Sequence, residues 1–122
     1  MSRYIILILL FSLTSFSCKQ PAIIESNEAV GLLENDDYYF LDVRTLKEHN
    51  TKSIPNTACI PVQKIEQRIE EIAQYKNKKI IVYCRSGNRS EIATKILNQN
   101  GFDAYNMLGG INEWKGEVNQ KR

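Results

Sequence analysis

One cysteine in a short, glycine-containing loop is the residue of this chain best suited to chemistry. The loop begins at Cys84 and continues as Arg-Ser-Gly-Asn-Arg-Ser to residue 90. An apolar, strand-like run over residues 79–83 precedes it, and a helical pattern follows it. Backbone N–H groups at a helix start carry partial positive charge, and the two arginines add full charges. Such surroundings lower a cysteine pKa from about 8.5 to roughly 3.5–7.5, so the loop predicts a thiolate that is open to solvent.

The same loop has the composition of an anion-binding cradle. Successive N–H groups of a tight turn can wrap a thiolate, or a persulfide anion that bears one extra sulfur. Gly87 permits the left-handed backbone that such a turn needs. We expect Arg85 and Arg89 to attract a small anionic substrate and to hold its oxygens, although Arg85 could equally be a solvated surface charge. Three side chains of the loop can add hydrogen-bond donors: Ser86, Asn88 and Ser90.

The segments around the loop alternate between strand-like and helix-like patterns. Strand-like runs cover residues 38–43, 58–60, 79–83 and 104–107, and helical patterns cover residues 26–33, 62–73 and 90–100. A capping box at residues 45–48 starts one further short helix. This alternation predicts an α/β fold with an open parallel β-sheet flanked by helices on both faces. Functional sites of such sheets lie at the carboxyl ends of the strands, and Cys84 follows one of those ends.

The first eighteen residues predict export from the cytoplasm. After Arg3, residues 4–13 form an apolar run of about ten residues, half of the roughly 20 that span a bilayer. The run is typical of the core of a secretory signal peptide. Small residues before Cys18 resemble the lipobox of bacterial lipoproteins, in which this cysteine is lipidated, although Ser15 stands where that box usually has leucine. The alternative is ordinary cleavage that leaves Cys18 as a free thiol.

These patterns divide the chain into a signal peptide (residues 1–17), a tether (18–25), one domain (26–116) and a flexible polar tail (117–122). A lipidated Cys18 would place the domain in the bacterial cell envelope, facing the periplasm. Lys19 follows that cysteine in place of the Asp that marks inner-membrane retention, which favours the outer membrane. The net charge of +2 is too small to indicate a nucleic-acid binder. The mature part has too few cysteines for a disulfide framework.

Four segments resemble, in the right order, the signatures of single-domain rhodaneses, the thiosulfate sulfurtransferase family. They are LDVR at residues 41–44 with Glu48, IPNTACIP at 54–61, CRSGNRS at 84–90 and LGGINEW at 108–114. The resemblance covers residues 26–115. The family has Gly-His where residues 52–53 are Lys-Ser, and Gly-Ala where residues 56–57 are Asn-Thr. Asn56 tolerates a left-handed backbone, so we expect the turn itself to survive.

The resemblance implies a rhodanese-like parallel sheet and a sulfurtransferase. Cys84 would take the outer sulfur of thiosulfate or a related small anionic donor and pass it, as a persulfide, to a thiol or to cyanide. It implies no metal or organic cofactor, and a single histidine cannot build a His-rich metal cluster. Asp42 and Arg44 are expected to be a structural pair that supports the loop. Expected partners are the donor, the acceptor and a membrane reached through the lipid anchor, with no nucleic acid and a monomeric chain.

Other interpretations of the cysteines stay open at this point. A phosphatase or arsenate reductase also uses a Cys–Arg loop, but with five residues between the two and usually His before the Cys. Here four residues intervene and Tyr83 precedes, which disfavours a phosphate group. A non-catalytic sulfur carrier or thiol-sensing lipoprotein is the second alternative, in which an oxidising envelope could inactivate Cys84. Cys59 is expected to be an inert buried residue, or else the redox partner of Cys84.

Overall fold

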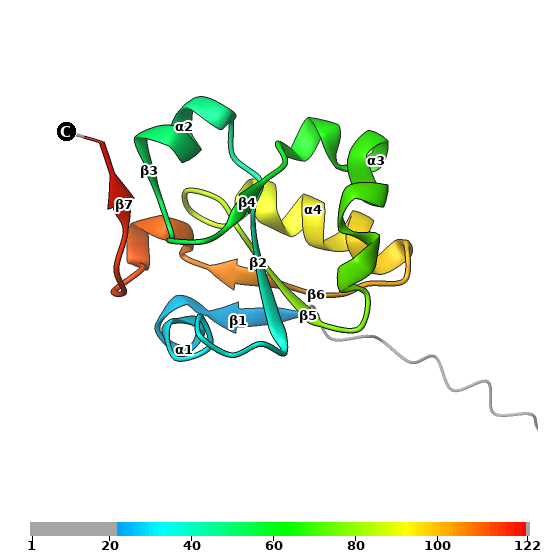
Figure 1. The fold of residues 1–122 in the computed structure, drawn as a ribbon, viewed down its shortest axis with the longest axis horizontal. Helices are drawn as coiled ribbons and strands as arrows, with labels where there is room; N and C mark the ends of the chain where they lie inside the picture. Colours follow the sequence, from blue (N-terminus) through cyan, green and yellow to red (C-terminus); the bar gives the residue numbers. More distant parts are fainter. Residues whose placement is uncertain (1–21, 122) are drawn as a thin grey trace, which may run out of the picture.

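The computed structural model describes residues 22–121, in which a five-stranded parallel sheet carries helices on both faces (Figure 1). The strand order is β1-β6-β5-β2-β4. The strands are β1 (Ile23–Glu25), β2 (Tyr38–Asp42), β4 (Ala58–Cys59), β5 (Lys79–Tyr83) and β6 (Asp103–Leu108). This is the α/β fold that the alternating pattern predicts. The predicted signal peptide and the lipidation site Cys18 lie outside the described residues.

The helical segments lie between the strands, as a parallel sheet requires. They are α1 (Ser26–Val30), α2 (Leu46–Thr51), α3 (Ile65–Arg68) and α4 (Asn88–Gln99), with 3-10 helices η1 (Val62–Lys64), η2 (Ile69–Tyr75) and η3 (Gly110–Glu113). The helical pattern predicted over residues 62–73 is therefore realised as three short consecutive pieces, η1, α3 and η2. Among the described residues, we find no helix with the length and apolar character needed to traverse a bilayer.

The central strand β5 separates two apolar clusters. Ile80, Val82 and Cys84 point to the cluster under α3 and α4, whereas Ile81 and Tyr83 point to the cluster under α1 and η3. Successive side chains of a strand alternate between faces, and both faces are covered. The run over residues 79–83 is accordingly apolar almost throughout. Cys84 thus enters the loop directly from the most buried strand of the sheet.

Two segments predicted to lack regular structure are short strands. Residues 23–25, expected to be part of the tether, form β1 and pair in parallel with the edge of β6, with Ile23 opposite Asn106. In the predicted tail, β7 (Asn119–Gln120) pairs antiparallel with β3 (Lys52–Ser53). The sequence did not predict these two strands, because strands of two or three residues are fixed by their partners rather than by a pattern of their own.

Candidate active site

Cys84 lies at the carboxyl end of β5, where the chain turns into α4. Gly87 caps that helix with a left-handed backbone (φ 111°), as its type predicts. This turn brings two backbone amides onto the sulfur: Gly87 N lies 3.1 Å and Ser90 N 3.4 Å from Cys84 Sγ. The hydroxyl of Ser90 lies 3.3 Å from the same sulfur. The loop is therefore the amide nest that the sequence predicts.

Burial by itself would raise the pKa of the Cys84 thiol. A hydrogen bond with the Ser90 hydroxyl, and hydrogen bonds from the amides of Ser90, Gly87 and Ser86, outweigh burial and hold the pKa of Cys84 below its usual value. These donors all favour the charged form of the sulfur. The geometry thus stabilises a thiolate, and would stabilise a persulfide anion in the same way.

The sulfur is not open to solvent, and that expectation is wrong. Cys84 is only 1% exposed and belongs to the apolar cluster that contains Ala93 and Leu97 of α4. The nest closes over the sulfur because Gly87 and Ser90 both turn their N–H groups toward it. In this conformation Cys84 presents almost no surface to an incoming donor. A groove of about 850 Å³ borders the loop at residues 86–88, but Cys84 is not among its lining residues.

A glycine pair after β6 supports the nest from outside. Ile111 N donates to the carbonyl of Cys84 (2.9 Å) and Asn112 N donates to that of Arg85 (3.1 Å). Gly110 itself packs against this backbone with φ 56°. A Cβ at this position would lie 2.4 Å from the Arg85 carbonyl oxygen and 2.6 Å from that of Cys84. Only glycine fits here, which explains why a Gly-Gly pair so far along the chain belongs to the site.

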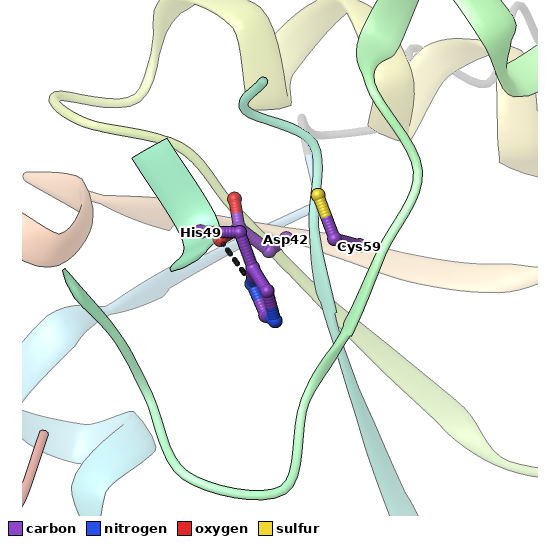
Figure 2. A group of neighbouring side chains, drawn as sticks. All are labelled: Asp42, His49 and Cys59. Atoms are coloured by element: carbon purple, nitrogen blue, oxygen red, sulfur yellow. Dashed lines mark hydrogen bonds and ion pairs between the residues drawn. The ribbon is translucent and has the colours of Figure 1, made fainter. Parts of the chain in front are cut away.

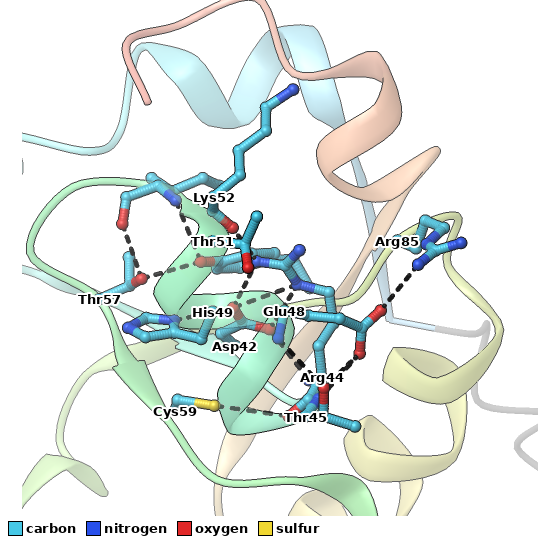
Figure 3. A network of polar contacts seen from close by, with 12 residues as sticks. Asp42, Arg44, Thr45, Glu48, His49, Thr51, Lys52, Thr57, Cys59 and Arg85 are labelled. Carbon is cyan, nitrogen blue, oxygen red and sulfur yellow. Dashed lines mark hydrogen bonds and ion pairs between the residues drawn. The ribbon is translucent and has the colours of Figure 1, made fainter. Parts of the chain in front are cut away.

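Both arginines of the loop are paired with Glu48 in this structure. Arg89 forms two hydrogen bonds to Glu48, Nη1 to Oε2 at 2.8 Å and Nη2 to Oε1 at 3.0 Å. Arg85 Nη2 reaches the same carboxylate at 3.2 Å (Figure 3). The α2 carboxylate thus pairs with both loop arginines, and their role in holding an anionic substrate stays a prediction. The side chains of Ser86 and Asn88 are exposed at the loop surface.

Asp42 and Arg44 form a buried ion pair, as expected for a structural pair. Arg44 Nη2 lies 2.8 Å and Nε 3.2 Å from Asp42 Oδ2. Arg44 Nη2 also donates to the Lys52 carbonyl at 2.6 Å, and its guanidinium lies 5.6 Å from the ring centroid of Tyr83. The pair therefore joins α2 and β3 to the residue that precedes Cys84, without touching the sulfur.

A second group of possible metal ligands lies beside this pair. One ligand atom each of Asp42, His49 and Cys59 lies within 4.8 Å of the others (Figure 2). The Asp42 carboxylate, however, already accepts hydrogen bonds from Arg44 and lies 2.9 Å from His49 Nδ1. A cation here would face the guanidinium of Arg44, which lies on the same carboxylate. The group is better explained as the hydrogen-bonded support of α2.

Cys59 has the opposite surroundings to Cys84. It is half-buried, and its Sγ donates to the Arg44 carbonyl at 3.4 Å. Burial, and then the negative charge of Asp42, raise the pKa of Cys59 to about 11. Strand β2 separates β4 from β5, so the ends of these two strands lie about 9–10 Å apart. Disulfides need Cα atoms within about 7 Å, so a Cys59–Cys84 pair would need backbone movement.

The family model for the rhodanese-like domain matches residues 25–117, most of the chain. The chain belongs to the rhodanese-like domain family. A protein named sulfurtransferase from Allochromatium vinosum is 36% identical over 84 residues, which are 68% of this chain and 77% of that protein. A rhodanese-like domain protein from Staphylococcus aureus has the same fold, with a TM-score of 0.72 and 31% identity over 84% of this chain and the whole of that one.

Other relatives are longer than this rhodanese-like domain. A putative sulfur carrier protein, YrkF of Bacillus subtilis, is 34% identical over 79 residues. The match covers 64% of this chain but only 42% of that protein. Sulfurtransferases and a sulfur carrier thus both occur among the relatives, and together with the family match they support a transferase of sulfur.

Sequence reasoning missed two residues of the rhodanese-like site. Asn106 of β6 accepts from Ser90 Oγ (2.5 Å) and donates to the Gly87 carbonyl (3.1 Å), although it is only 4% exposed. The sequence could have indicated this role, because Asn106 is a polar residue that stands directly before the apolar Met107 and Leu108 in a strand. Glu48 was noted as part of a motif and of a capping box, but not as the partner of the loop arginines. Its partners lie 37 and 41 residues away in sequence, beyond what local patterns reveal.

Proposed function

We propose that this rhodanese-like domain moves a sulfane sulfur from a donor to an acceptor through a persulfide on Cys84. The observation that carries the proposal is the pair of backbone amides, of Gly87 and Ser90, that donate to the Cys84 sulfur. A thiolate is the nucleophilic form of cysteine, and the same donors can stabilise the persulfide anion that follows. Membership of the family supports sulfur transfer.

The proposed reaction has two displacement steps. In the first, the Cys84 thiolate attacks the outer sulfur of thiosulfate or a related donor. A new S–S bond forms while that of the donor breaks, and its electron pair leaves with sulfite. In the second step, a thiolate or cyanide attacks the outer sulfur of the persulfide, and the electron pair of that S–S bond returns to Cys84. No external oxidant or reductant is needed.

Thiocyanate formation from thiosulfate and cyanide tests this proposal, together with the intact mass of the domain. Thiosulfate should add about 32 Da, the mass of one sulfur atom, and cyanide should remove it. Cys84→Ser should lose both signals. Cys59→Ser is the matched control and should keep them, because the Cys59 sulfur points to the Arg44 carbonyl instead of into the nest. A mass gain that persists in Cys84→Ser would contradict the proposal.

A non-catalytic sulfur carrier is the second candidate, favoured by one feature of the loop. Cys84 is nearly enclosed and both loop arginines are paired with Glu48, which limits access by small anions. A relative is itself named a putative sulfur carrier protein. A carrier would hold the extra 32 Da, the mass of one sulfur, on Cys84 without sustained thiocyanate formation. Turnover and mass gain measured on one sample therefore separate the two candidates.

The proposed location is the periplasmic side of the cell envelope, with the chain anchored by lipid on Cys18. The support is the apolar run of residues 4–13 and the lipobox-like residues before Cys18. Multiple acyl chains give stable anchoring where a single chain does not. In detergent phase partitioning, the full chain should enter the detergent-rich phase, and Cys18→Ala should move it to the aqueous phase. Retention of Cys18→Ala to the same degree would contradict lipid anchoring.

A further inference from the structure

One carboxylate holds both arginines of the cysteine loop. Glu48 accepts from Arg89 through both of its oxygens and from Arg85 through Oε1. The Glu48 side chain is 19% exposed, that of Arg89 32% and that of Arg85 64%. The Glu48–Arg89 pair is thus partly shielded from water, and partly buried charge pairs are screened less than exposed ones. The carboxylate is therefore held beside both arginines of the loop, and we call the group of Glu48, Arg85 and Arg89 the entrance to the loop.

Glu48 is also fixed from its own side of the contact. Its Oε2 accepts from the backbone N and from Oγ1 of Thr45, each at 3.0 Å, and its own N–H donates to Thr45 Oγ1 at 3.2 Å (Figure 3). This capping box at the start of α2 points the carboxylate toward the loop without help from the arginines. Hydrogen bonds from Arg89, and then from Thr45, outweigh partial burial and hold the pKa of Glu48 far below its usual range.

The charges at the entrance therefore sum to less than the loop sequence suggests. Two guanidinium groups supply +2 and Glu48 supplies −1, which leaves +1 at the loop. An incoming anion meets a fixed negative charge between the two cations that would otherwise hold its oxygens. Because Coulomb energies scale with the product of charges, this carboxylate opposes a dianion about twice as strongly as a monoanion.

We propose that Glu48 is a specificity-determining residue that limits the charge of the donor, favouring singly charged sulfane donors over the thiosulfate dianion. The proposal rests on the proposed function of Cys84 as the sulfur acceptor. With methanethiosulfonate, a monoanion in which a methyl group replaces one oxygen of thiosulfate, the step balances. The Cys84 thiolate bonds to the outer sulfur, the S–S bond of the donor breaks, and its electron pair leaves with methanesulfinate.

Glu48→Gln tests the proposal with little risk to the fold, because glutamine also completes a capping box. The variant raises the charge of the entrance from +1 to +2. It should raise kcat/KM for thiosulfate by about tenfold and for methanethiosulfonate by about threefold, the square root of that factor. The gain should lie mainly in KM. Glu71→Gln is the matched control, since it removes the same charge from an exposed ion pair with Arg68, and it should leave both values unchanged.

Equal gains for the two donors, or a loss for thiosulfate, would overturn the proposal, because Glu48 would then only align the arginines. Alkylation of Cys84 provides a readout that needs no sulfur transfer. In Glu48→Gln the rate with iodoacetate should rise about threefold relative to neutral iodoacetamide, with no change in Glu71→Gln. If this ratio rises while neither donor adds sulfur to Cys84, Glu48 limits the charge of the reagent but the proposed function fails. If sulfur is transferred but Glu48→Gln changes neither the alkylation ratio nor the preference between the two donors, the proposed role of Glu48 is wrong.

Discussion

Cys84 follows strand β5 and Cys59 ends strand β4, and a single strand of the same parallel sheet lies between the two. Cys84 is the more deeply buried of the two, yet its pKa is lowered, whereas that of half-buried Cys59 is raised to about 11. Burial alone would predict the reverse order. The difference lies in the polar groups that each sulfur meets: backbone N–H donors at Cys84, and a carbonyl and the carboxylate of Asp42 at Cys59.

The contrast teaches that the direction of the neighbouring backbone N–H groups, more than the exposure of the side chain, determines whether the pKa of a cysteine is lowered. The left-handed Gly87 turns two amides inward at the start of α4. Cys59 instead lies in a short strand and donates its own proton to a carbonyl. The pKa of the same residue type is thereby lowered in one place and raised in the other.

The largest expected effect separates the two cysteines directly. Cys84→Ser should reduce sulfur transfer by at least about 1,000-fold, because it removes the nucleophile. Cys59→Ser should retain the activity within about twofold, since a serine hydroxyl can also donate to the Arg44 carbonyl. Initial rates of thiocyanate formation measure both. A comparable loss of sulfur transfer in the two variants would contradict the assignment of Cys84 alone as the nucleophile.

A second variant disturbs the Cys84 loop and leaves the Cys59 segment in place. Gly110→Ala should lower sulfur transfer by about 100-fold, the scale of a displacement of about 1 Å at a reacting group. The new Cβ would collide with the carbonyls of Arg85 and Cys84. The reactivity of Cys59 toward iodoacetamide should not change.

Gly31→Ala is the matched control for this substitution. Gly31 has a φ of −70°, and an added Cβ would meet its nearest atom at 3.7 Å, which is ordinary contact. This variant should therefore keep full activity. Full activity in Gly110→Ala as well would mean that the glycine pair does not position the loop.

The smallest of these effects concerns one donor of the nest. Ser90→Ala should raise the pKa of Cys84, because it removes the hydroxyl that hydrogen-bonds with the sulfur. Sulfur transfer near neutral pH should fall about tenfold as the thiolate fraction falls. Thiolate absorbance across pH measures the pKa shift. Thr94→Val removes a hydroxyl from the same helix that bonds only the Ser90 carbonyl, and it should leave the pKa of Cys84 unchanged.

The order of strands and helices could be predicted from the sequence because the buried elements carry their own patterns. The continuous apolar run of β5 and the apolar spacing of α4 are such patterns. The left-handed backbone at Asn56 was also predictable from residue type and is confirmed, with φ 59°. Strands β1 and β7 were not, because three and two residues contain too little of a pattern to detect.

The candidate site could be predicted only where local sequence determines it. The loop around Cys84 supplies its own turn and amides, so its nest followed from seven consecutive residues. The enclosure of the sulfur and the pairing of Arg85 and Arg89 with Glu48 depend on contacts across the sheet. Such contacts leave no periodic signal in a single sequence, which is why the charge at the loop entrance was overestimated.

The pH dependence of alkylation at each cysteine tests the central claim most directly. Iodoacetamide rates for Cys84 and Cys59, resolved by peptide mass spectrometry on one sample, report the two thiolate fractions separately. The account predicts a midpoint for Cys84 below the ordinary value of about 8.5, and one near 11 for Cys59. A midpoint for Cys84 at or above that of an ordinary cysteine would contradict a thiolate held by the nest.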